Sequence, residues 1–360
     1  MNSAGKSKIL FVLPSLCGGG AERVTLNLVK GLYERNKLVE LLVFDFSGPL
    51  VSEIPAGIRV HDLKTNSLRH SLIPMIRLIR LIKPNIVFST LGYVNIAILF
   101  VRPLLNTGVS IWIREANLPS ISLRNNPYFI IFWIGYRLIY QTANKILCTS
   151  ERMREEMILN FKIPKRKIFL LHNPVDKNKI RKLSLTPKSI SNIGKNFISV
   201  GSLTYQKGFD RVILWFSIIA NKDDNLLILG SGELKDELID IARNLDITNQ
   251  VVFMEFCANP WEWISGADVL LLPSRWEGMP NVALESLACG TPIISTYDAG
   301  GILEVQKQVK PQSVIIALTE NEFIDAMTKV NSDLSLYNKE SLLPRCYEIN
   351  RVISKFERMF

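Results

Sequence analysis

Short apolar runs rich in β-branched residues alternate with longer helical patterns along most of the chain. The first βαβ pattern spans residues 8–46: a strand at 8–13, a helix at 21–35 with Val24, Leu28 and Leu32 spaced by four, and a strand at 39–46. Further strands are predicted at 85–90, 109–113, 145–149 and 168–171. Continuous apolar strands separated by helices are typical of a mostly parallel sheet with helices on both faces.

The alternation starts again after residue 196, which predicts a second domain of the same class. Its strands are expected at 197–200, 226–229, 251–253, 268–272 and 292–295, and its helices at 207–220, 234–245 and 281–289. The stretch 173–196 is rich in Lys, Ser, Asn and Pro, which favours an interdomain linker. We therefore predict an α/β protein with two doubly wound, Rossmann-like domains: 1–175, completed by a C-terminal helix at 345–360, and 176–344, which includes the linker.

Open α/β sheets bind ligands at the carboxyl ends of their strands. Two such domains are expected to hold a ligand in the cleft between them. Turns that contain glycine after a strand are therefore the first places to search for functional residues.

The net positive charge of the chain comes entirely from its first half. Residues 1–175 hold 23 Lys and Arg against 10 Asp and Glu, a net charge of +13, whereas residues 176–360 carry −3. This asymmetry indicates an anionic partner, either nucleic acid or anionic lipid, although a solvated basic face explains it equally well. The five cysteines are scattered and form no CxxC pair, which excludes a disulfide scaffold or zinc ribbon and favours a reducing compartment.

One stretch in the second half, 267–285, joins a buried strand, a loop and a helix start with two carboxylates. The strand ends at Pro273, the loop carries Glu277, and the helix that begins near Pro280 contains Glu285. The N–H groups of a helix start suit a phosphate, and carboxylates suit hydroxyl donors. A sugar nucleotide supplies both groups. As isolated residues, Glu277 could equally cap the loop and Glu285 could be a solvated first-turn acid.

The wider stretch strongly resembles glycosyltransferase family 4, the retaining, nucleotide-sugar-dependent enzymes of GT-B fold. The family pattern E-G-x-P-x-x-x-x-E is present from Glu277 to Glu285, and the resemblance continues through 288–294 and 299–304. The run Gly18 to Glu22 resembles the N-terminal glycine loop of the family, and 172–176 resembles its domain junction. Residues 200–208 resemble the donor-phosphate segment, with Ser202 where many members carry arginine.

The resemblance implies donor-site roles in this chain. Glu277 would bind hydroxyls of the donor sugar and, with Lys207, act in catalysis, while Glu285 would bind the ribose. The other donor-binding residues implied are Gly19, Gly20, Gly201, Ser202, Gly278, Met279, Pro280 and Asn281, with backbone amides of 278–281 on the diphosphate. The sequence contains no HExxH and no acidic metal cluster, so we expect neither metal nor other cofactor.

The resemblance also implies an activity. We expect a hexose to move, with retention, from a nucleotide diphosphate sugar, with UDP as the expected nucleotide, to an acceptor hydroxyl. The acceptor would be a saccharide or lipid-linked saccharide in polysaccharide or glycoconjugate synthesis. On the acceptor side, Arg114, Glu115 and Asn117 follow the strand 109–113 and are expected to point into the cleft.

Two stretches of the basic half suggest an anionic membrane surface as a partner. Residues 67–83 predict an amphipathic helix with Arg69, Arg77, Arg80 and Lys83, and residues 128–140 are apolar and aromatic. Ordinary core packing explains the second stretch at least as well. We expect a cytoplasmic protein at the inner face of the membrane, without a nucleic-acid partner.

Two alternatives remain open. A GT-B relative that epimerises or phosphorolyses a sugar belongs to a different enzyme class. A non-catalytic membrane-binding module would use the basic half alone, and would need neither Lys207 nor the two glutamates.

Overall fold

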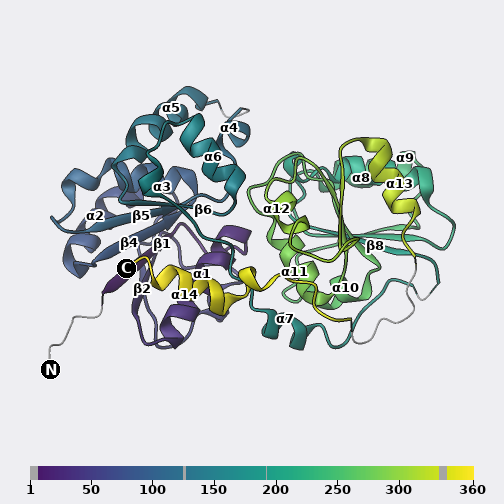
Figure 1. Cartoon of the computed structure of the whole chain (residues 1–360), viewed down its shortest axis with the longest axis horizontal. Helices are drawn as coiled ribbons and strands as arrows, with labels where there is room; N and C mark the ends of the chain where they lie inside the picture. Colours follow the sequence, from purple (N-terminus) through teal and green to yellow (C-terminus); the bar gives the residue numbers. More distant parts are fainter. Residues whose placement is uncertain (1–6, 125–126, 192, 332–338) are drawn as a thin grey trace. The chain divides into compact units, whose positions relative to one another are not determined.

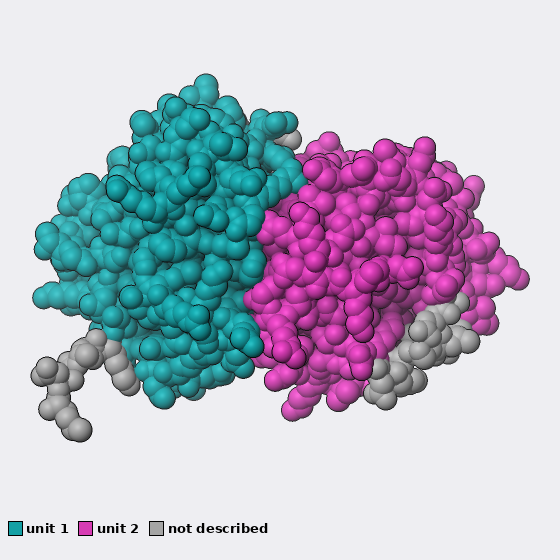
Figure 2. All heavy atoms as spheres, viewed as in Figure 1, with its two compact units in different colours: residues 1–174, 349–360 teal, residues 175–348 magenta. Residues whose placement is uncertain are grey.

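The computed structural model describes residues 7–124, 127–191, 193–331 and 339–360. The chain divides into two compact units, which Figure 2 colours separately: Met1–Pro174 with Ile349–Phe360 form unit 1, and Val175–Glu348 forms unit 2. The sequence placed these boundaries at 175/176 and 344/345. The second boundary lies after Glu348 in the structure, because the 3-10 turn Arg345–Tyr347 belongs to unit 2. In this turn Tyr347 is buried, and its carbonyl oxygen accepts a hydrogen bond from Val175 N–H (2.9 Å).

Unit 1 is built on a seven-stranded parallel sheet in the order β3-β2-β1-β4-β5-β6-β7. The strands are β1 (Lys8–Leu13), β2 (Leu38–Val43), β3 (Arg59–Asp62), β4 (Ile86–Thr90), β5 (Ser110–Arg114), β6 (Lys145–Cys148) and β7 (Ile168–Leu170). The helices are α1 (Gly20–Glu34), α2 (Leu68–Ile82), α3 (Gly92–Phe100), α4 (Pro119–Ser122), α5 (Phe129–Ile134), α6 (Glu151–Leu159) and α14 (Ile349–Glu357).

Helices cover both faces of this sheet because β1 is apolar on both faces (Figure 1). Leu10 and Val12 pack with α2, α3 and α6, whereas Phe11 and its alternating neighbours pack with α1 and α14. Successive side chains of a strand point to opposite faces, so a continuous apolar run requires cover on each.

Unit 2 repeats this plan with a six-stranded parallel sheet in the order β10-β9-β8-β11-β12-β13. The strands are β8 (Asn196–Val200), β9 (Asn225–Leu229), β10 (Val251–Met254), β11 (Val269–Leu272), β12 (Ile293–Thr296) and β13 (Val314–Ala317). The helices are α7 (Lys177–Leu183), α8 (Phe209–Ile219), α9 (Lys235–Asn244), α10 (Trp261–Gly266), α11 (Asn281–Cys289), α12 (Ile302–Gln306) and α13 (Glu320–Thr328). Figure 1 shows helices on both faces.

The stretch predicted as a linker is partly structured. It contains α7, which begins where the side chain of Asp176 accepts a hydrogen bond from Lys179 N–H and which buries Ile180 in the core of unit 2. The sequence missed this helix because seven residues rich in Lys and Arg give little apolar periodicity. Of the predicted linker, residue 192 lies outside the described ranges.

Both sheets have a topological switch point. From β1 the chain continues to β2 on one side, and from the adjacent β4 it continues to β5 on the other; β8 and β11 have the same relation in unit 2. Open α/β sheets bind ligands at the carboxyl edge beside such a strand pair.

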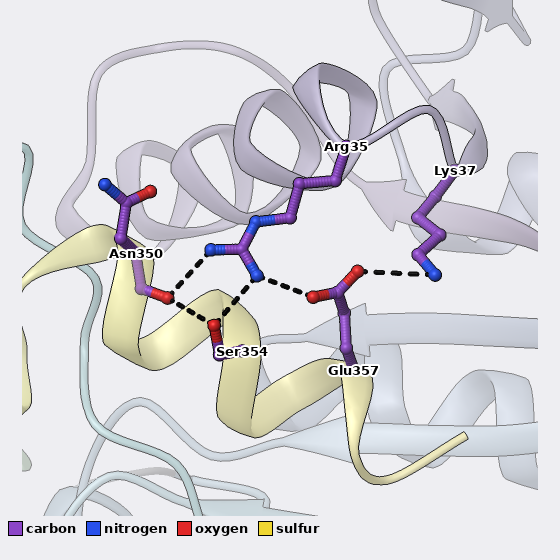
Figure 3. A network of polar contacts seen from close by, with 5 residues as sticks. All are labelled: Arg35, Lys37, Asn350, Ser354 and Glu357. Atoms are coloured by element: carbon purple, nitrogen blue, oxygen red, sulfur yellow. Dashed lines mark hydrogen bonds and ion pairs between the residues drawn. The ribbon is translucent and has the colours of Figure 1, made fainter.

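The last helix of the chain, α14, is tied to unit 1 by a polar network (Figure 3). The Arg35 guanidinium donates to Ser354 Oγ (2.9 Å), Glu357 Oε2 (2.6 Å) and the Asn350 carbonyl (2.9 Å), and Lys37 Nζ lies 3.3 Å from Glu357 Oε1. Burial would raise the pKa of Glu357, but hydrogen bonds from Arg35 and Lys37 outweigh it and lower that pKa. The network therefore reinforces the apolar contacts of α14.

We expect Glu357→Gln to destabilise unit 1 modestly at neutral pH, by about 0.5–1 kcal/mol because the pair is partly exposed. A carboxyl group whose pKa is lower in the folded than in the unfolded state stabilises the fold at pH values above its unfolded-state pKa. This stabilisation disappears as the pH falls through the folded-state pKa. Melting temperatures of the variant and wild type should therefore converge in acid. Glu34→Gln, on the exposed end of α1, is the control and should match the wild type throughout; a pH-independent gap for Glu357→Gln would contradict the assignment.

Candidate active site

Two loops meet at the carboxyl edge of the sheet in unit 2. One joins β8 to α8 and carries Lys207, and the other joins β11 to α11 and carries Glu277. Because β8 and β11 are neighbours at the switch point, residues 70 positions apart in sequence come into contact.

An ion pair joins these two loops. Lys207 Nζ lies 2.5 Å from Glu277 Oε1, and Ser274 Oγ donates to the same oxygen at 3.0 Å. Glu277 is only 5% exposed. The sequence correctly placed Glu277 on a loop, but the loop folds inward, and the buried carboxylate is balanced by a cation and a hydroxyl donor.

Lys207 lies in a 3-10 turn, Tyr205–Lys207, and not at the start of a helix as the sequence predicted. Gly208 follows with a φ of +70°, a left-handed conformation that glycine adopts readily, and α8 begins at Phe209. This change of direction separates the lysine from the helix and leaves its side chain facing the second loop.

A second contact between the loops involves Arg275, which the sequence analysis did not single out. Its guanidinium donates to both carboxylate oxygens of Asp210 (2.8 and 2.6 Å) and lies 3.9 Å from the ring centroid of Tyr205. Burial would raise the pKa of Asp210, but the hydrogen bonds from Arg275 lower it. Backbone contacts add to this pairing, since Arg275 N–H donates to the Gln206 carbonyl (2.8 Å). The two loops are therefore held together independently of the Lys207–Glu277 pair.

The glycines after β12 support the backbone of Glu277. Gly300 has a φ of +63°, and a Cβ there would lie 2.0 Å from the Glu277 carbonyl oxygen. Gly301 N–H donates to the Gly278 carbonyl at 2.8 Å. Any side chain at Gly300 would displace the loop that carries Glu277. The absence of a side chain at Gly300 therefore allows the backbone of Glu277 to take its observed position.

The second glutamate of the motif, Glu285, lies within α11 and has its own partner. Trp261, which is buried at the start of α10, donates from Nε1 to Glu285 Oε2 at 3.0 Å. Helix α11 begins at Asn281, after Pro280. Proline has no N–H, so Pro280 can shape this helix start but cannot donate to an anion.

Other predicted donor residues have different surroundings. Gly201 N–H donates to the Leu229 carbonyl (3.0 Å), so that amide is already bonded within unit 2, while Ser202 is exposed on the turn. Gly278 and Met279 are buried. In unit 1, Gly19 precedes α1 and Gly20 begins it, and both are exposed.

The predicted acceptor residues Arg114 and Glu115 are buried, each 2% exposed, and the expectation that they face an open site is wrong for both. Arg114 donates to Thr90 Oγ1 (3.2 Å) and Asn173 Oδ1 (2.5 Å). The reason is local, because Arg114 is the last residue of β5 and its side chain turns into unit 1. Asn117, three residues later, is partly exposed.

Glu115 is enclosed by neutral hydrogen-bond donors. It accepts hydrogen bonds from Asn95 Nδ2 (2.9 Å), Tyr136 OH (3.1 Å) and Tyr140 OH. Burial raises the pKa of Glu115 to about 7, although these donors act in the opposite direction. The two tyrosines come from the apolar stretch 128–140, so one face of that stretch is core, as the alternative interpretation held.

Within the described ranges, no three His, Cys, Asp or Glu side chains are grouped so that they could hold a metal ion. Lys207 and Arg275 both bring positive charge to these loops, Lys207 paired with Glu277 and Arg275 with Asp210. Such a site can bind an anion through the lysine and hydroxyl groups through the carboxylates.

Comparison with known proteins identifies the family. The model of Glycosyltransferase Family 4 matches residues 18–179, and that of Glycosyl transferases group 1 matches 187–340. The chain is 28% identical over 311 residues, 83% of each chain, to the N-acetylgalactosamine-N,N'-diacetylbacillosaminyl-diphospho-undecaprenol 4-alpha-N-acetylgalactosaminyltransferase of Campylobacter jejuni. It is 31% identical over 245 residues to the uncharacterized glycosyltransferase MJ1059 of Methanocaldococcus jannaschii, covering 64% of this chain and 60% of that relative.

Solved structures show the same architecture. Anabaena Alr3699/HepE in complex with UDP and glucose superposes with a TM-score of 0.77 at 15% identity, covering 98% of this chain and 99% of that one. Sucrose-phosphate synthase of Thermosynechococcus elongatus gives a TM-score of 0.78 at 16% identity, covering 98% of each chain. The chain therefore belongs to the family 4-like glycosyltransferases and has their GT-B fold.

Proposed function

We propose that this protein transfers a sugar, with retention, from a UDP-sugar to a hydroxyl of a saccharide acceptor carried on a lipid. The observation that carries the proposal is the Lys207–Glu277 ion pair at the switch point of unit 2. The Campylobacter relative supports the choice of acceptor, because its name specifies a diphospho-undecaprenol-linked saccharide. UDP is supported by HepE, whose structure contains UDP and glucose.

In the proposed mechanism the donor substrate breaks the ion pair between Lys207 and Glu277 and binds to both side chains. The diphosphate takes Lys207, and Glu277 is released to accept hydrogen bonds from hydroxyls of the donor sugar. Glu285, held by Trp261, would accept from the ribose. Negative charge grows on the leaving diphosphate as the glycosidic bond breaks, so a fixed cation there binds the transition state more strongly than the ground state. Retention follows if the acceptor attacks from the face that the diphosphate leaves, with the leaving phosphate accepting the acceptor proton.

Donor-dependent thermal shifts test the proposal. The purified protein is melted with UDP-, GDP-, ADP- and CMP-sugars, and UDP release is then followed with and without octyl glycosides as acceptors. A ligand at 100 times its Kd stabilises by about 2.7 kcal/mol, so a true donor should raise the melting temperature clearly. We expect UDP-sugars alone to do so and acceptors to accelerate UDP release. Phosphate incorporation would indicate a phosphorylase, and UDP release unaffected by every acceptor would favour an epimerase.

Activity should persist in EDTA, because in the proposed mechanism Lys207 supplies the positive charge that a metal ion would otherwise bring to the diphosphate. The measurement is the rate of UDP release before and after EDTA treatment, with Mg²⁺ or Mn²⁺ added back. A rate that falls in EDTA and recovers with either metal would overturn the metal-independent assignment.

Two surfaces of unit 1 support a membrane-bound acceptor. Helix α2 buries Met75 and Ile79 and exposes Arg69 and Arg77. On α5 and the turn after it, Ile130 (70% exposed), Ile131 (69%), Ile134 (49%) and Leu138 (61%) face outward. Basic groups and exposed aliphatic side chains suit the surface of an anionic bilayer. Across the described ranges, no helix is long and apolar enough to span a membrane.

Binding to vesicles should be reversible and salt-sensitive, because each cation near an anionic leaflet contributes about 1 kcal/mol. In flotation assays we expect the protein to rise with phosphatidylglycerol vesicles at low salt and to stay behind with phosphatidylcholine. Arg69→Glu with Arg77→Glu should abolish flotation and leave UDP-sugar hydrolysis unchanged. Lys222→Glu with Lys307→Glu makes the same charge change on exposed residues of unit 2 and is the control. Equal flotation of both pairs, or none at any salt concentration for the wild type, would contradict the membrane proposal.

A further inference from the structure

The switch point of unit 1 has the same topology as the one that holds Lys207 and Glu277 in unit 2. The strand pair β1 and β4 corresponds to β8 and β11. In unit 1, the loop after β1 leads to Glu22 in the first turn of α1, and the loop after β4 leads to Tyr93 in the first turn of α3. The sequence analysis assigned a function to neither residue.

Glu22 differs from an ordinary first-turn acid. Such an acid, facing solvent near the positive end of a helix, has a lowered pKa. Burial instead raises the pKa of Glu22 above its usual value, although its own backbone N–H acts in the opposite direction. Its carboxylate lies against Gly19, where a Cβ would be 2.3 Å from Oε2. The glycine loop therefore provides the space that this carboxylate occupies.

Tyr93 follows β4, the strand beside the one that leads to Glu22. Burial raises the pKa of Tyr93, and the charge of Glu22 raises it further. The side chain is nevertheless 39% exposed, so part of it faces solvent. A carboxylate acceptor and a phenol that can both donate and accept therefore follow the two neighbouring strands of the switch point, at the carboxyl edge of the sheet.

The turn that carries Tyr93 is held in one conformation by the buried network of Glu115. Leu91 has a φ of +77°, which is costly for a residue other than glycine, and its carbonyl accepts from Asn95 N–H at 2.9 Å. A Cβ on Gly92 would lie 2.1 Å from the hydroxyl oxygen of Tyr136, which donates to Glu115. Glu115 thus supports the turn through Tyr136 and Asn95, as a positioning residue.

We propose that Glu22 and Tyr93 form an acceptor subsite of unit 1 that binds hydroxyl groups of a neutral sugar. This inference rests on the proposed function. The Glu22 carboxylate accepts a hydrogen bond from one hydroxyl, and Tyr93 OH bonds a second oxygen of the same sugar. A carboxylate repels phosphate, so the subsite takes the terminal sugar of the acceptor and not the diphosphate of a lipid carrier.

The test measures acceptor and donor steps separately in Glu22→Gln, Tyr93→Phe and Gly19→Ala. Gly19 has a φ of −64° and a ψ of 159°, which alanine adopts without strain, so Gly19→Ala acts by displacing the Glu22 carboxylate. Glu34→Gln and Tyr33→Phe, on exposed residues at the other end of α1, are matched controls. Acceptor KM is measured with octyl glycosides of glucose, galactose, N-acetylglucosamine and N-acetylgalactosamine, donor binding with UDP, and the donor step by UDP-sugar hydrolysis without acceptor.

We expect the acceptor KM to rise about ten-fold or more in Glu22→Gln and Tyr93→Phe, because each loses a hydrogen bond at a partly buried site. Gly19→Ala should raise the acceptor KM as well, while UDP affinity, hydrolysis and melting temperature stay close to wild type in Glu22→Gln and Tyr93→Phe. An acceptor KM within two-fold of wild type in all three variants would overturn the inference. So would a parallel loss of UDP affinity, which would place Glu22 at the donor. Failure of the proposed function is seen separately, as a wild-type protein that releases no UDP from any UDP-sugar.

Discussion

Replacing Lys207 by Ala should lower kcat/KM for sugar transfer by about 30- to 1,000-fold, which corresponds to about 2–4 kcal/mol of transition-state stabilisation. The lysine is held at the switch point of unit 2 by a 3-10 turn and by the ion pair with Glu277. In the proposed mechanism its contact with the diphosphate strengthens as the glycosidic bond breaks, so kcat should fall as well as donor affinity. Steady-state kinetics and calorimetric titration with UDP measure the two effects.

Lys195→Ala is the matched control for this variant. Lys195 immediately precedes β8, at the opposite end of the strand from Lys207, and donates to the Thr328 carbonyl (2.8 Å). It should retain wild-type kinetics. Wild-type kinetics in Lys207→Ala would contradict the assigned site, whereas a folded Lys207→Ala with lost turnover would support it.

Glu277→Gln should lower kcat on the order of 100-fold and leave UDP affinity equal to or higher than that of the wild type. The two effects have one cause. The carboxylate of Glu277 is paired with Lys207. In the proposed mechanism its neutralisation frees the lysine for the diphosphate and removes the charged acceptor for donor-sugar hydroxyls. Kinetics with a UDP-sugar and titration with UDP alone separate them.

The amide introduced by Glu277→Gln retains an oxygen that accepts from Ser274 Oγ, so the loss of stability should be moderate despite the burial of this side chain. Glu237→Gln, on an exposed position of α9, is the control and should match the wild type in every assay. Retained turnover per folded molecule together with a large fall in melting temperature would show that Glu277 only supports the loop.

The sequence predicted most strands that are encoded by a local apolar run, although it missed β13, whose residues are Val-Ile-Ile-Ala. The apolar runs of β1 and β8 are continuous and were found, whereas β3, which carries Arg59, His61 and Asp62 at the sheet edge, has no such run and was missed. Helix starts were less predictable, because the left-handed Gly208 moves the start of α8 from Lys207 to Phe209.

Residues of the candidate site were predicted only where they belong to a sequence motif. Glu277, Gly278 and Glu285 were found through one continuous pattern, and Lys207 through a separate one. Arg275 lies two residues before the first of these patterns, but its partner Asp210 is 65 positions away and belongs to no motif, so the pairing was not predicted. Arg114 and Glu115 were placed at the correct end of the strand. The direction of their side chains depends on contacts with Thr90, Asn95 and Tyr136, and no motif in the sequence links these residues.

The anomeric configuration of the reaction product tests the central claim most directly. The protein is incubated with an α-linked UDP-sugar and the octyl glycoside that best accelerates UDP release, and the purified product is examined by mass spectrometry and by the proton coupling of its new anomeric centre. We predict a product heavier than the acceptor by one sugar residue, with the new linkage α. A β-linked product, or free sugar and UDP without any glycosylated acceptor, would contradict the assignment of a retaining sugar transferase.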